Sequence, residues 1–255
     1  MDEILKLMLS RHSYRGPYDP NRRIRQEDLT MILEAAQWAP TAHNMQNFEV
    51  VVVNDKQMLA EIGNLPVRLS ESFLRENYAQ LSFTEEEFRR RRTGILASMF
   101  PASWTEPGEW QPDGGGTLSQ LAFLSRSMQD TPLLLIVLYD TRRRAPASEG
   151  DVLGFISLGC VLENMWLMSE SLGLSLHVLS AFSGDTVEQQ VKYLLQIPDF
   201  QRIAYACSLG YPAPRKVEYL RVRRELQDFV HYNRFGNRDL EWPAAATESK
   251  EAKSK

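Results

Sequence analysis

Cysteine is scarce in this chain of 255 residues, which contains only Cys160 and Cys207. The two are far apart, and each lies in an apolar stretch. No Cys-x-x-Cys pair occurs, and the four histidines lack the spacing of metal ligands. We therefore expect two buried, inert thiols, and neither a disulfide framework nor a metal site.

Several other signals are also missing. We find no charged-then-apolar leader and no apolar run of membrane-spanning length, so a cytoplasmic protein without a membrane partner is expected. The formal net charge of -4 opposes a nucleic-acid partner, because such proteins usually carry an excess of basic residues. The absence of Gly-x-Ser-x-Gly and Gly-x-Gly-x-x-Gly motifs removes the main support for a hydrolase or a dinucleotide-binding fold.

Helical and strand patterns are mixed along the chain without strict alternation. Apolar periodicity predicts helices over residues 25–38, 151–172 and 185–195, and β-branched or apolar runs predict strands over 48–53, 132–139, 174–179 and 203–210. Asp185 and Glu188 have the spacing of a capping box, Thr84 with Glu87 has the same spacing, and Gly173 suits the residue after a helix. The mixture predicts an α+β layer fold with one sheet.

The middle and the end of the chain differ from this pattern. Residues 56–130 read as a variable insert or lid, with possible helices at 58–62 and 71–78 and a loop-like stretch at 101–116. Trp104 and Trp110 in that stretch could stack on an aromatic substrate or, equally, pack on a neighbouring subunit. Residues 1–240 are predicted to form a single domain that ends in a basic, aromatic arm at 215–240, and residues 241–255 a disordered tail.

Two short segments carry the chemistry of a phosphate and of a flat heteroaromatic ring. The first is Arg11-His12-Ser13-Tyr14-Arg15, and the second is residues 39–46, which precede the first predicted strand. Arginine offers a planar fork of donors to a phosphate, and a nearby cation stabilises the negative charge of a reduced flavin. We expect Arg11 and Ser13 to suit the phosphate of FMN and Arg15 to suit the N1/O2 edge of its ring.

The second segment supplies amides. Asn44 and Gln46 can read the alternating donors and acceptors of the flavin pyrimidine edge. Simpler explanations exist, because residues 11–15 could be solvated residues that cap the preceding helix, and Asn44 could bond to its own backbone. His12 and His43 each favour a structural role. The joint occurrence of both segments, with a strand directly after the second, favours the flavin.

Four motifs together resemble the FMN-dependent nitroreductase family. They are Arg-His-Ser-x-Arg near the N-terminus, Ala-Pro-x-x-x-Asn-x-Gln before the first strand, the apolar helix at 158–173 and the Leu-Gly-Tyr-Pro turn at 209–212. The resemblance covers roughly residues 1–55 and 130–235. It implies a three-layer fold with a central mixed, mainly antiparallel sheet flanked by helices, and a homodimer with two FMN molecules at its interface.

The resemblance also implies an activity. NADH or NADPH would reduce the flavin, and a nitroaromatic, quinone or related aromatic acceptor would oxidise it, in ping-pong hydride transfer through flavin N5 without a catalytic side chain. Carried over by position, the residues implied at the cofactor are Arg11, His12, Ser13, Arg15, Pro40, Thr41, Asn44, Gln46, Leu179, Ser180, Arg221 and Arg223. Arg221 and Arg223 would join the phosphate contacts, and Leu179 and Ser180 would offer backbone groups near N5.

Three alternatives remain open at this point. One is a specialised flavoenzyme of the same family, such as a reductive dehalogenase, a dehydrogenase or a flavin-modifying enzyme. Another is a non-catalytic FMN-binding protein. The third is an α+β enzyme without a flavin.

Overall fold

The structure is a computed structural model, and it describes residues 2–66, 78–100, 105, 128, 130–214 and 220–238. The chain forms two compact units. The first contains Met1–Leu69 and Pro112–Glu218, and the second contains Ser70–Gln111 and Tyr219–Lys255. Trp104, Trp110, most of the predicted 71–78 helix and the predicted tail at 241–255 lie outside the described residues.

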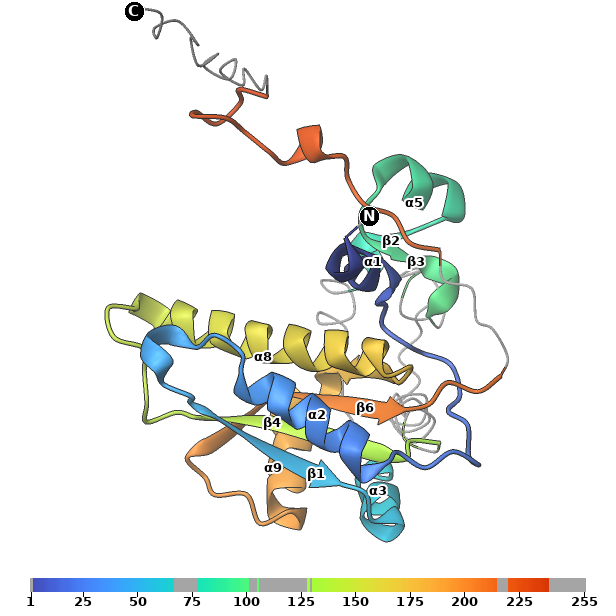
Figure 1. The fold of residues 1–255 in the computed structure, drawn as a ribbon, viewed down its shortest axis with the longest axis vertical. Coiled ribbons are helices and arrows are strands. Elements are labelled where there is room, and N and C mark those ends of the chain that lie inside the picture. The colour runs from blue at the N-terminus through green and yellow to red at the C-terminus, as the bar shows by residue number, and fades with distance from the viewer. Residues whose placement is uncertain are drawn as a thin grey trace, which may run out of the picture. The chain divides into compact units, whose positions relative to one another are not determined.

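A four-stranded sheet forms the centre of the first unit (Figure 1). Its strands, in spatial order, are β1 (Phe48–Val53), β4 (Leu133–Asp140), β6 (Gln201–Gly210) and β5 (Ser175–Leu179). All three neighbouring pairs are antiparallel, and the β4–β6 ladder shifts register between Val137 and Leu138. The four predicted strands are confirmed, although β6 begins at Gln201, two residues before the predicted start.

Helices cover both faces of this sheet. One face carries α2 (Gln26–Gln37) and α8 (Val152–Ser171), and the other carries α3 (Lys56–Gly63) and α9 (Asp185–Leu194). Strand β4 alternates between the two cores, with Leu134, Ile136 and Leu138 in the α3/α9 core and Leu133, Leu135 and Val137 in the α2/α8 core. Because both faces are buried, the strand is apolar at nearly every position. The predicted three-layer α+β fold is confirmed.

Helix α8 is apolar nearly all round, as predicted. By length and composition, the helical stretch Glu149–Ser171 could cross a membrane, so the expectation that no such run exists was wrong. Leu158, Val161 and Met165 nevertheless pack in the α2/α8 core, as in the central helix of a layered fold. The helix ends where predicted, because Gly173 has a φ of 71°, a left-handed conformation that glycine adopts without strain.

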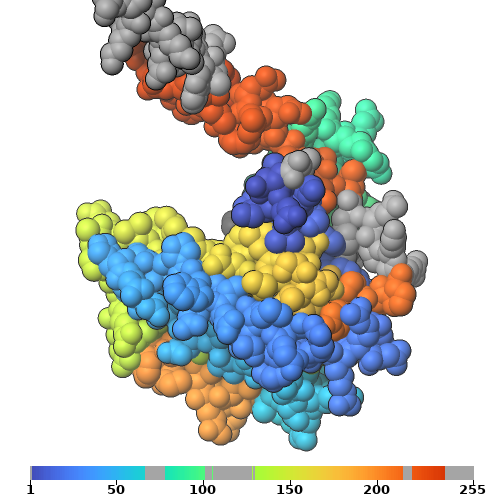
Figure 2. All heavy atoms as spheres, in the orientation of Figure 1, coloured from blue at the N-terminus to red at the C-terminus, as the bar shows by residue number. Residues whose placement is uncertain are grey.

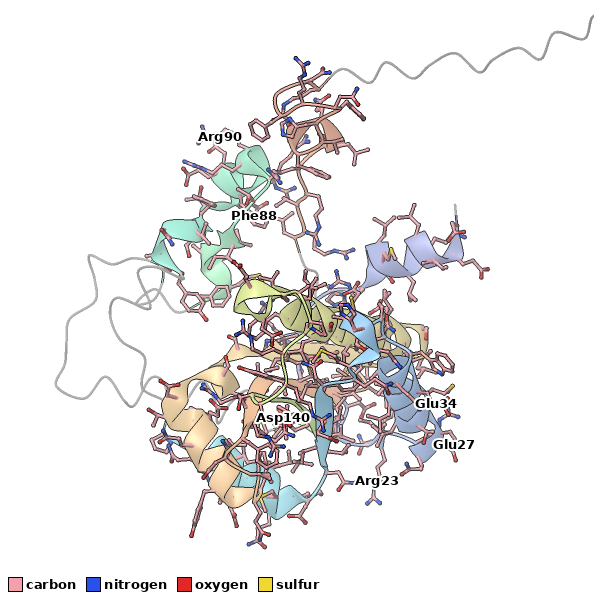
Figure 3. All side chains as sticks on the ribbon, turned by 90° about the vertical axis from the view of Figure 1, so that its left-hand side faces the viewer. Arg23, Glu27, Glu34, Phe88, Arg90 and Asp140 are labelled. Carbon is pink, nitrogen blue, oxygen red and sulfur yellow. The ribbon has the colours of Figure 1, made fainter. Side chains whose placement is uncertain are left out.

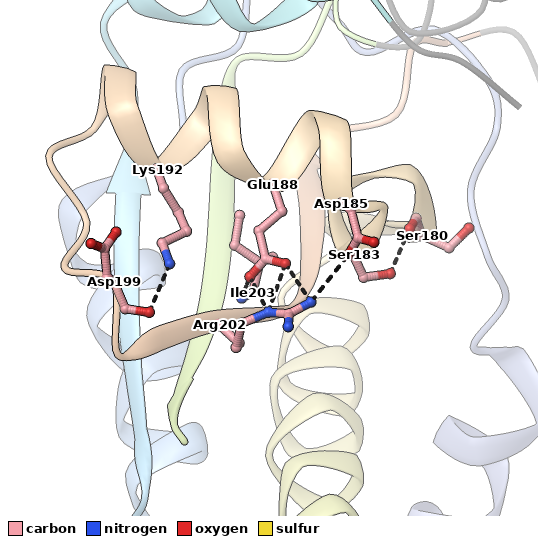
Figure 4. Close-up of polar contacts among 8 residues, drawn as sticks. All are labelled: Ser180, Ser183, Asp185, Glu188, Lys192, Asp199, Arg202 and Ile203. Carbon is pink, nitrogen blue, oxygen red and sulfur yellow. Dashed lines mark hydrogen bonds and ion pairs between the residues drawn. The ribbon is translucent and has the colours of Figure 1, made fainter. Parts of the chain in front are cut away.

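The predicted capping box of α9 is wrong. The helix begins after Gly184 without a side-chain cap, and Glu188 turns inward instead (Figure 4). Its carboxylate accepts hydrogen bonds from Arg202 Nε and from the backbone N of Ile203, each at 2.8 Å. A buried carboxylate needs strong donors, and a guanidinium with a strand N–H satisfies it better than the start of its own helix.

The described residues of the second unit include the helix α5 (Glu85–Arg91) and a two-stranded parallel sheet of β2 (Ser82–Phe83) and β3 (Ile95–Leu96). The predicted cap of α5 is confirmed, since Thr84 Oγ1 accepts from Glu87 N at 3.3 Å. Phe88 is buried, whereas Arg90 points outward (Figure 3). An ion pair between Arg92 and Glu225 joins residues 78–100 to residues 220–238 within this unit.

Short elements connect and flank these layers. They are α1 (Glu3–Ser10) and the 3-10 helices η1 (Ala42–Asn44), η4 (Glu149–Asp151) and η5 (Ser180–Ser183) in the first unit, and η2 (Ala79–Leu81), η3 (Ala97–Met99) and η6 (Leu226–Asp228) in the second. Both cysteines are free thiols. Cys207 is buried as predicted, and burial raises its pKa, whereas the prediction for Cys160 was wrong because that thiol is only partly buried.

Candidate functional site

The segment that follows α1 is fixed to the sheet edge and to α8. The backbone N of Tyr14 donates to Leu176 O at 3.1 Å, on the outer edge of β5. The indole N–H of Trp166, in the C-terminal half of α8, donates to His12 O at 3.3 Å. The Arg-His-Ser-x-Arg motif is therefore held in an extended conformation between a helix and an edge strand.

Arg11 lies against α8. Its Nε is 3.2 Å from Glu163 Oε1, and its guanidinium carbon is 4.5 Å from the centre of the Trp166 ring. Only 21% of the Arg11 side chain is exposed. Stacking on an indole and pairing with a carboxylate orient this guanidinium, and arginine has five N–H donors with which it can serve more than one acceptor. The residue suits the predicted phosphate contact, although Glu163 competes for it.

Arg15 is exposed and acts electrostatically on His177 of β5. Burial, together with the positive charge of Arg15, lowers the pKa of His177 to about 4. The imidazole is therefore neutral at pH 7, and it adds no second cation beside Arg15. A positive charge at the edge of β5 suits the predicted role of Arg15 at the N1/O2 edge of a flavin.

The loop before β1 is bent by three residues in the left-handed region. The φ angles are 52° for His43, 53° for Asn44 and 44° for Gln46. Residues other than glycine reach these angles at a cost, and such strain is common at ligand sites. Hydrogen bonds hold the bend: Thr41 Oγ1 accepts from Gln46 N at 3.1 Å, and Ala42 N donates to Ser157 Oγ of α8 at 2.9 Å.

The two predicted amides of this loop contact each other. Gln46 Nε2 donates to Asn44 Oδ1 at 3.0 Å, and both side chains are exposed. Within the described part of the chain, Asn44 Nδ2 and Gln46 Oε1 make no further hydrogen bond. The pair therefore presents one donor and one acceptor, as a flavin pyrimidine edge requires. Pro40 is exposed at the start of the same loop.

Sequence reasoning missed Asn47, which follows this loop directly. The residue is only 4% exposed, and its Nδ2 is buried without a hydrogen-bond partner among the described residues. An unsatisfied buried amide is costly, so it points to an acceptor that comes from outside these residues. The sequence offered one signal for this residue, because Asn47 is a third amide side chain directly after Asn44 and Gln46.

One chain does not bring the two segments together. Residues 41–46 are tied to Ser157 in the N-terminal half of α8, and residues 11–15 are tied to Trp166 in its C-terminal half (Figure 1). Between these two anchors the helix rises by about 14 Å, at roughly 1.5 Å per residue. The bonds within one copy therefore fix each segment to a different half of the helix.

The remaining predicted residues have mixed positions. The side chain of Leu179 is buried in the α3/α9 core, so only its backbone is open to a ligand, whereas Ser180 is exposed. Arg221 and Arg223 belong to the second unit, and their contact with the phosphate stays a prediction. Ser13 is half-buried beside Tyr14.

Comparisons with known sequences identify a family for this chain. The sequence model of the Nitroreductase family matches residues 8–211. A protein of Archaeoglobus fulgidus, named for NADH dehydrogenase or NAD(P)H nitroreductase activity, is 42% identical over 63 residues. That match covers 25% of this chain and 35% of the relative, so it spans about a third of the relative's length.

Solved structures share the fold. A protein of Bacteroides thetaiotaomicron, named for the same two activities, has a TM-score of 0.59 at 16% identity, covering 92% of this chain and 99% of that one. A nitroreductase of Bacteroides fragilis with bound FMN has a TM-score of 0.54 at 20% identity, covering 88% and 96%. Iodotyrosine deiodinase bound to FMN and 3-iodo-L-tyrosine has a TM-score of 0.56 at 21% identity, covering 91% and 100%. Because the family match extends over most of its residues, this chain belongs to the nitroreductase family.

Proposed function

We propose that this protein is an FMN-dependent oxidoreductase that uses NADH or NADPH to reduce nitroaromatic, quinone or related aromatic acceptors. The observation that supports it most is the placement of Arg11 and Arg15 on one short segment fixed to α8 and to the edge of β5. The chain belongs to the nitroreductase family, so the ligand expected at this cationic segment is FMN. Positive charge stabilises both the phosphate of FMN and its reduced ring.

The residues present fit FMN. When bound, the cofactor would supply the hydride chemistry at N5, for NAD(P)H and the acceptor in turn. Arg11 and Ser13 would hold the phosphate, and Arg15 would stabilise negative charge at the N1/O2 edge. Asn44, Gln46 and the unsatisfied amide of Asn47 would bond to the polar edge of the ring.

A second copy would bring these two groups of residues together. In α1, none of the residues is buried, and Ile4, Leu5, Met8 and Leu9 are all at least 46% exposed. The first turns of α8 expose Val152, Leu153, Phe155 and Ile156. Figure 2 shows both helices at the surface of the molecule. Exposed apolar side chains gathered on helices are typical of a subunit interface.

A two-fold axis across α8 would place the helix antiparallel to its copy. Residues 41–46 of one chain, at the N-terminal half of its helix, would then face residues 11–15 of the other. We propose a homodimer that binds two FMN molecules in this way. The arrangement explains why one chain separates the two segments and why α1 and α8 leave apolar side chains exposed.

Anaerobic spectroscopy tests the activity. Purified protein is expected to hold FMN, to lose its visible absorption on addition of NADH or NADPH, and to regain it with a quinone or a nitroaromatic compound. Double-reciprocal plots of the steady-state rate, with NAD(P)H varied at several fixed acceptor concentrations, are expected to give parallel lines. This ping-pong pattern follows because NAD(P)H and the acceptor use the same face of the flavin ring in turn. A flavin that neither nucleotide bleaches would indicate a non-catalytic FMN-binding protein, and failure to take up FMN would remove the flavin altogether. Halogenated phenols in the acceptor panel separate a dehalogenase from a nitroreductase.

A further inference from the structure

We propose a second small-molecule site in the first unit, which binds an anion attached to a flat apolar body. A cavity of about 740 Å³ lies beside Asn54, directly after the edge strand β1, between the first turn of α2 and helix α3. Small-molecule pockets usually measure roughly 300–1,000 Å³, so the cavity can hold a ligand of one or two fused rings with a phosphate or carboxylate.

The sequence of α3 explains why the space is open. Lys56, Leu59, Ala60 and Gly63 line the cavity, at the spacing of one helix face. Ala60 and Gly63 are too small to fill the distance to α2. Because α2 and α3 cover opposite faces of the sheet, the gap at the end of β1 is bounded by one helix from each layer.

The deeper wall is apolar. It is formed by Ile24, Leu29, Leu59, Met128, Pro132 and Leu133. Leu29, Leu59 and Leu133 are buried, and they belong to the two cores on either side of the sheet. A ring system placed against these side chains would lose its contact with water, which favours an apolar body for the ligand.

The rim is cationic. Arg22, Arg23, Arg25 and Lys56 line the cavity, against Asp19 and Asp130. Arg25 is paired with Asp28 at 2.6 Å, and the Arg22 guanidinium lies 3.7 Å from the centre of the Tyr211 ring. For Arg23 and Lys56, the described residues include no acidic side chain within ion-pair distance.

Arg23 and Lys56 come from the two sides of the cavity. Arg23 belongs to the loop before α2, and Lys56 is the first residue of α3. Two cations above an apolar wall favour a phosphate or carboxylate on an aromatic ring.

The cavity is distinct from the proposed flavin site. Residues 41–46 precede β1 and the cavity follows it, so the strand separates them by about 20 Å, at roughly 3.3 Å per residue. On the other side, Leu133 lines the cavity and Leu176 holds Tyr14, with Leu209 between them in register. Two strand spacings of roughly 4.8 Å lie between Leu133 and Leu176.

Calorimetric titration of FMN-saturated protein tests the proposal, with 1-naphthyl phosphate, 1-naphthol and inorganic phosphate as probes. One molecule of 1-naphthyl phosphate is expected to bind per chain, at least tenfold more tightly than 1-naphthol or inorganic phosphate. Naphthol keeps only the contacts with the apolar wall, and inorganic phosphate keeps only those with the cations. The visible flavin spectrum is expected to stay unchanged. Equal affinity for naphthol, or a flavin spectrum that shifts in step with binding, would overturn the proposal. If the protein takes up no FMN, the proposed flavin site fails, and the same three affinities measured without FMN still test this cavity.

Matched variants locate the binding. Lys56→Gln and Arg23→Gln are each expected to weaken naphthyl phosphate binding by about tenfold, the effect of one charged hydrogen bond. Ala60→Phe fills the cavity and is expected to abolish binding. Gln57→Glu and Gln57→Phe are the controls, because Gln57 is exposed on the same helix and does not line the cavity. Binding that survives Ala60→Phe refutes the site, and if that variant does not fold, unchanged affinity in Lys56→Gln and Arg23→Gln refutes it.

Discussion

The hydroxyl of Tyr211 donates a 2.5 Å hydrogen bond to Oδ2 of the buried carboxylate of Asp28. This bond joins the turn after β6 to the first turn of α2. Arg25 binds the same carboxylate, with its Nε 2.9 Å from Oδ2 and its Nη2 2.6 Å from Oδ1. Hydrogen bonds from Arg25 first, and then from Tyr211, hold the pKa of Asp28 below its usual value.

Tyr211→Phe is expected to lower the free energy of unfolding by about 1–3 kcal/mol, because a buried acceptor loses a donor while the ring and its packing remain. Urea denaturation followed by circular dichroism measures the change. Tyr193→Phe is the control, since Tyr193 is 86% exposed and its loss of a hydroxyl is expected to change stability by less than about 0.5 kcal/mol. Equal stability of the two variants would contradict the role of the Tyr211 bond.

Acid stability is expected to depend on Asp140. Hydrogen bonds from Arg142 lower the pKa of Asp140 from 3.8 to about 2. The unfolded chain therefore takes up this proton at higher pH than the folded chain does. The stabilisation is complete above about pH 4 and is lost as the pH falls through 2. Denaturant titrations at about pH 5 and about pH 2 measure how much the free energy of unfolding falls between them. The fall is expected to be smaller for Asp140→Asn than for the parent, and an equal fall would refute the role of Asp140.

His177 is expected to make stability fall at milder acidity. Its folded pKa is about 4, below the ordinary value of 6.5, so the unfolded chain binds the proton first. The free energy of unfolding is expected to decrease between pH 6.5 and pH 4, and less steeply in His177→Gln. Since Arg15 contributes to the shift, Arg15→Ala is expected to raise the pKa of His177 in proton NMR titrations. An unchanged value would place Arg15 away from this imidazole.

Substitutions of the two partners in the Arg11–Glu163 ion pair are expected to change the affinity for FMN in opposite directions. Arg11→Ala removes a charged donor and is expected to weaken FMN binding by about 1.5–3 kcal/mol. Glu163→Gln removes the carboxylate that lies 3.2 Å from Arg11 Nε, and it is expected to tighten binding because the competing charge is gone. Fluorescence titration of free FMN measures both. Weaker binding in Glu163→Gln would show that the pair positions Arg11 and does not compete with the phosphate.

Arg15→Ala is expected to lower the midpoint potential of bound FMN, because the reduced flavin loses a neighbouring positive charge. Arg15→Lys keeps the charge and is expected to stay closer to the parent value. The midpoint potentials of the parent and both variants are measured against reference dyes. Equal potentials in the parent and in Arg15→Ala would remove Arg15 from the N1/O2 edge.

Much of the fold could be predicted from the sequence, for reasons visible in single elements. Strand β4 is apolar at nearly every position because it lies between two cores, and α2 shows one apolar stripe because only one of its faces packs on the sheet. The turn at 209–212 also has a physical reason. A Cβ at Gly210 would lie 2.6 Å from the ring of Tyr18 and from Pro132, so glycine lets the segment after residues 11–15 cross the sheet end.

Other features could not be predicted, because they depend on partners distant in sequence. Glu188 has the spacing of a helix cap, yet Arg202 and Ile203 on the neighbouring strand bind it instead. The separation of residues 11–15 from residues 41–46 depends on where each segment meets α8, which no local pattern encodes. The orphan amide of Asn47 likewise requires knowledge of its burial.

The most direct test of the proposed flavin site uses a mixed dimer of Arg11→Ala and Asn44→Ala chains, isolated with two different affinity tags. If FMN lies between residues 11–15 of one chain and residues 41–46 of the other, one site of this dimer has both intact segments and the other has both defects. FMN titration is then expected to show one molecule bound per dimer with the parent affinity. A mixed dimer that binds FMN no better than either variant alone, or chains that form no dimer, would contradict the shared site.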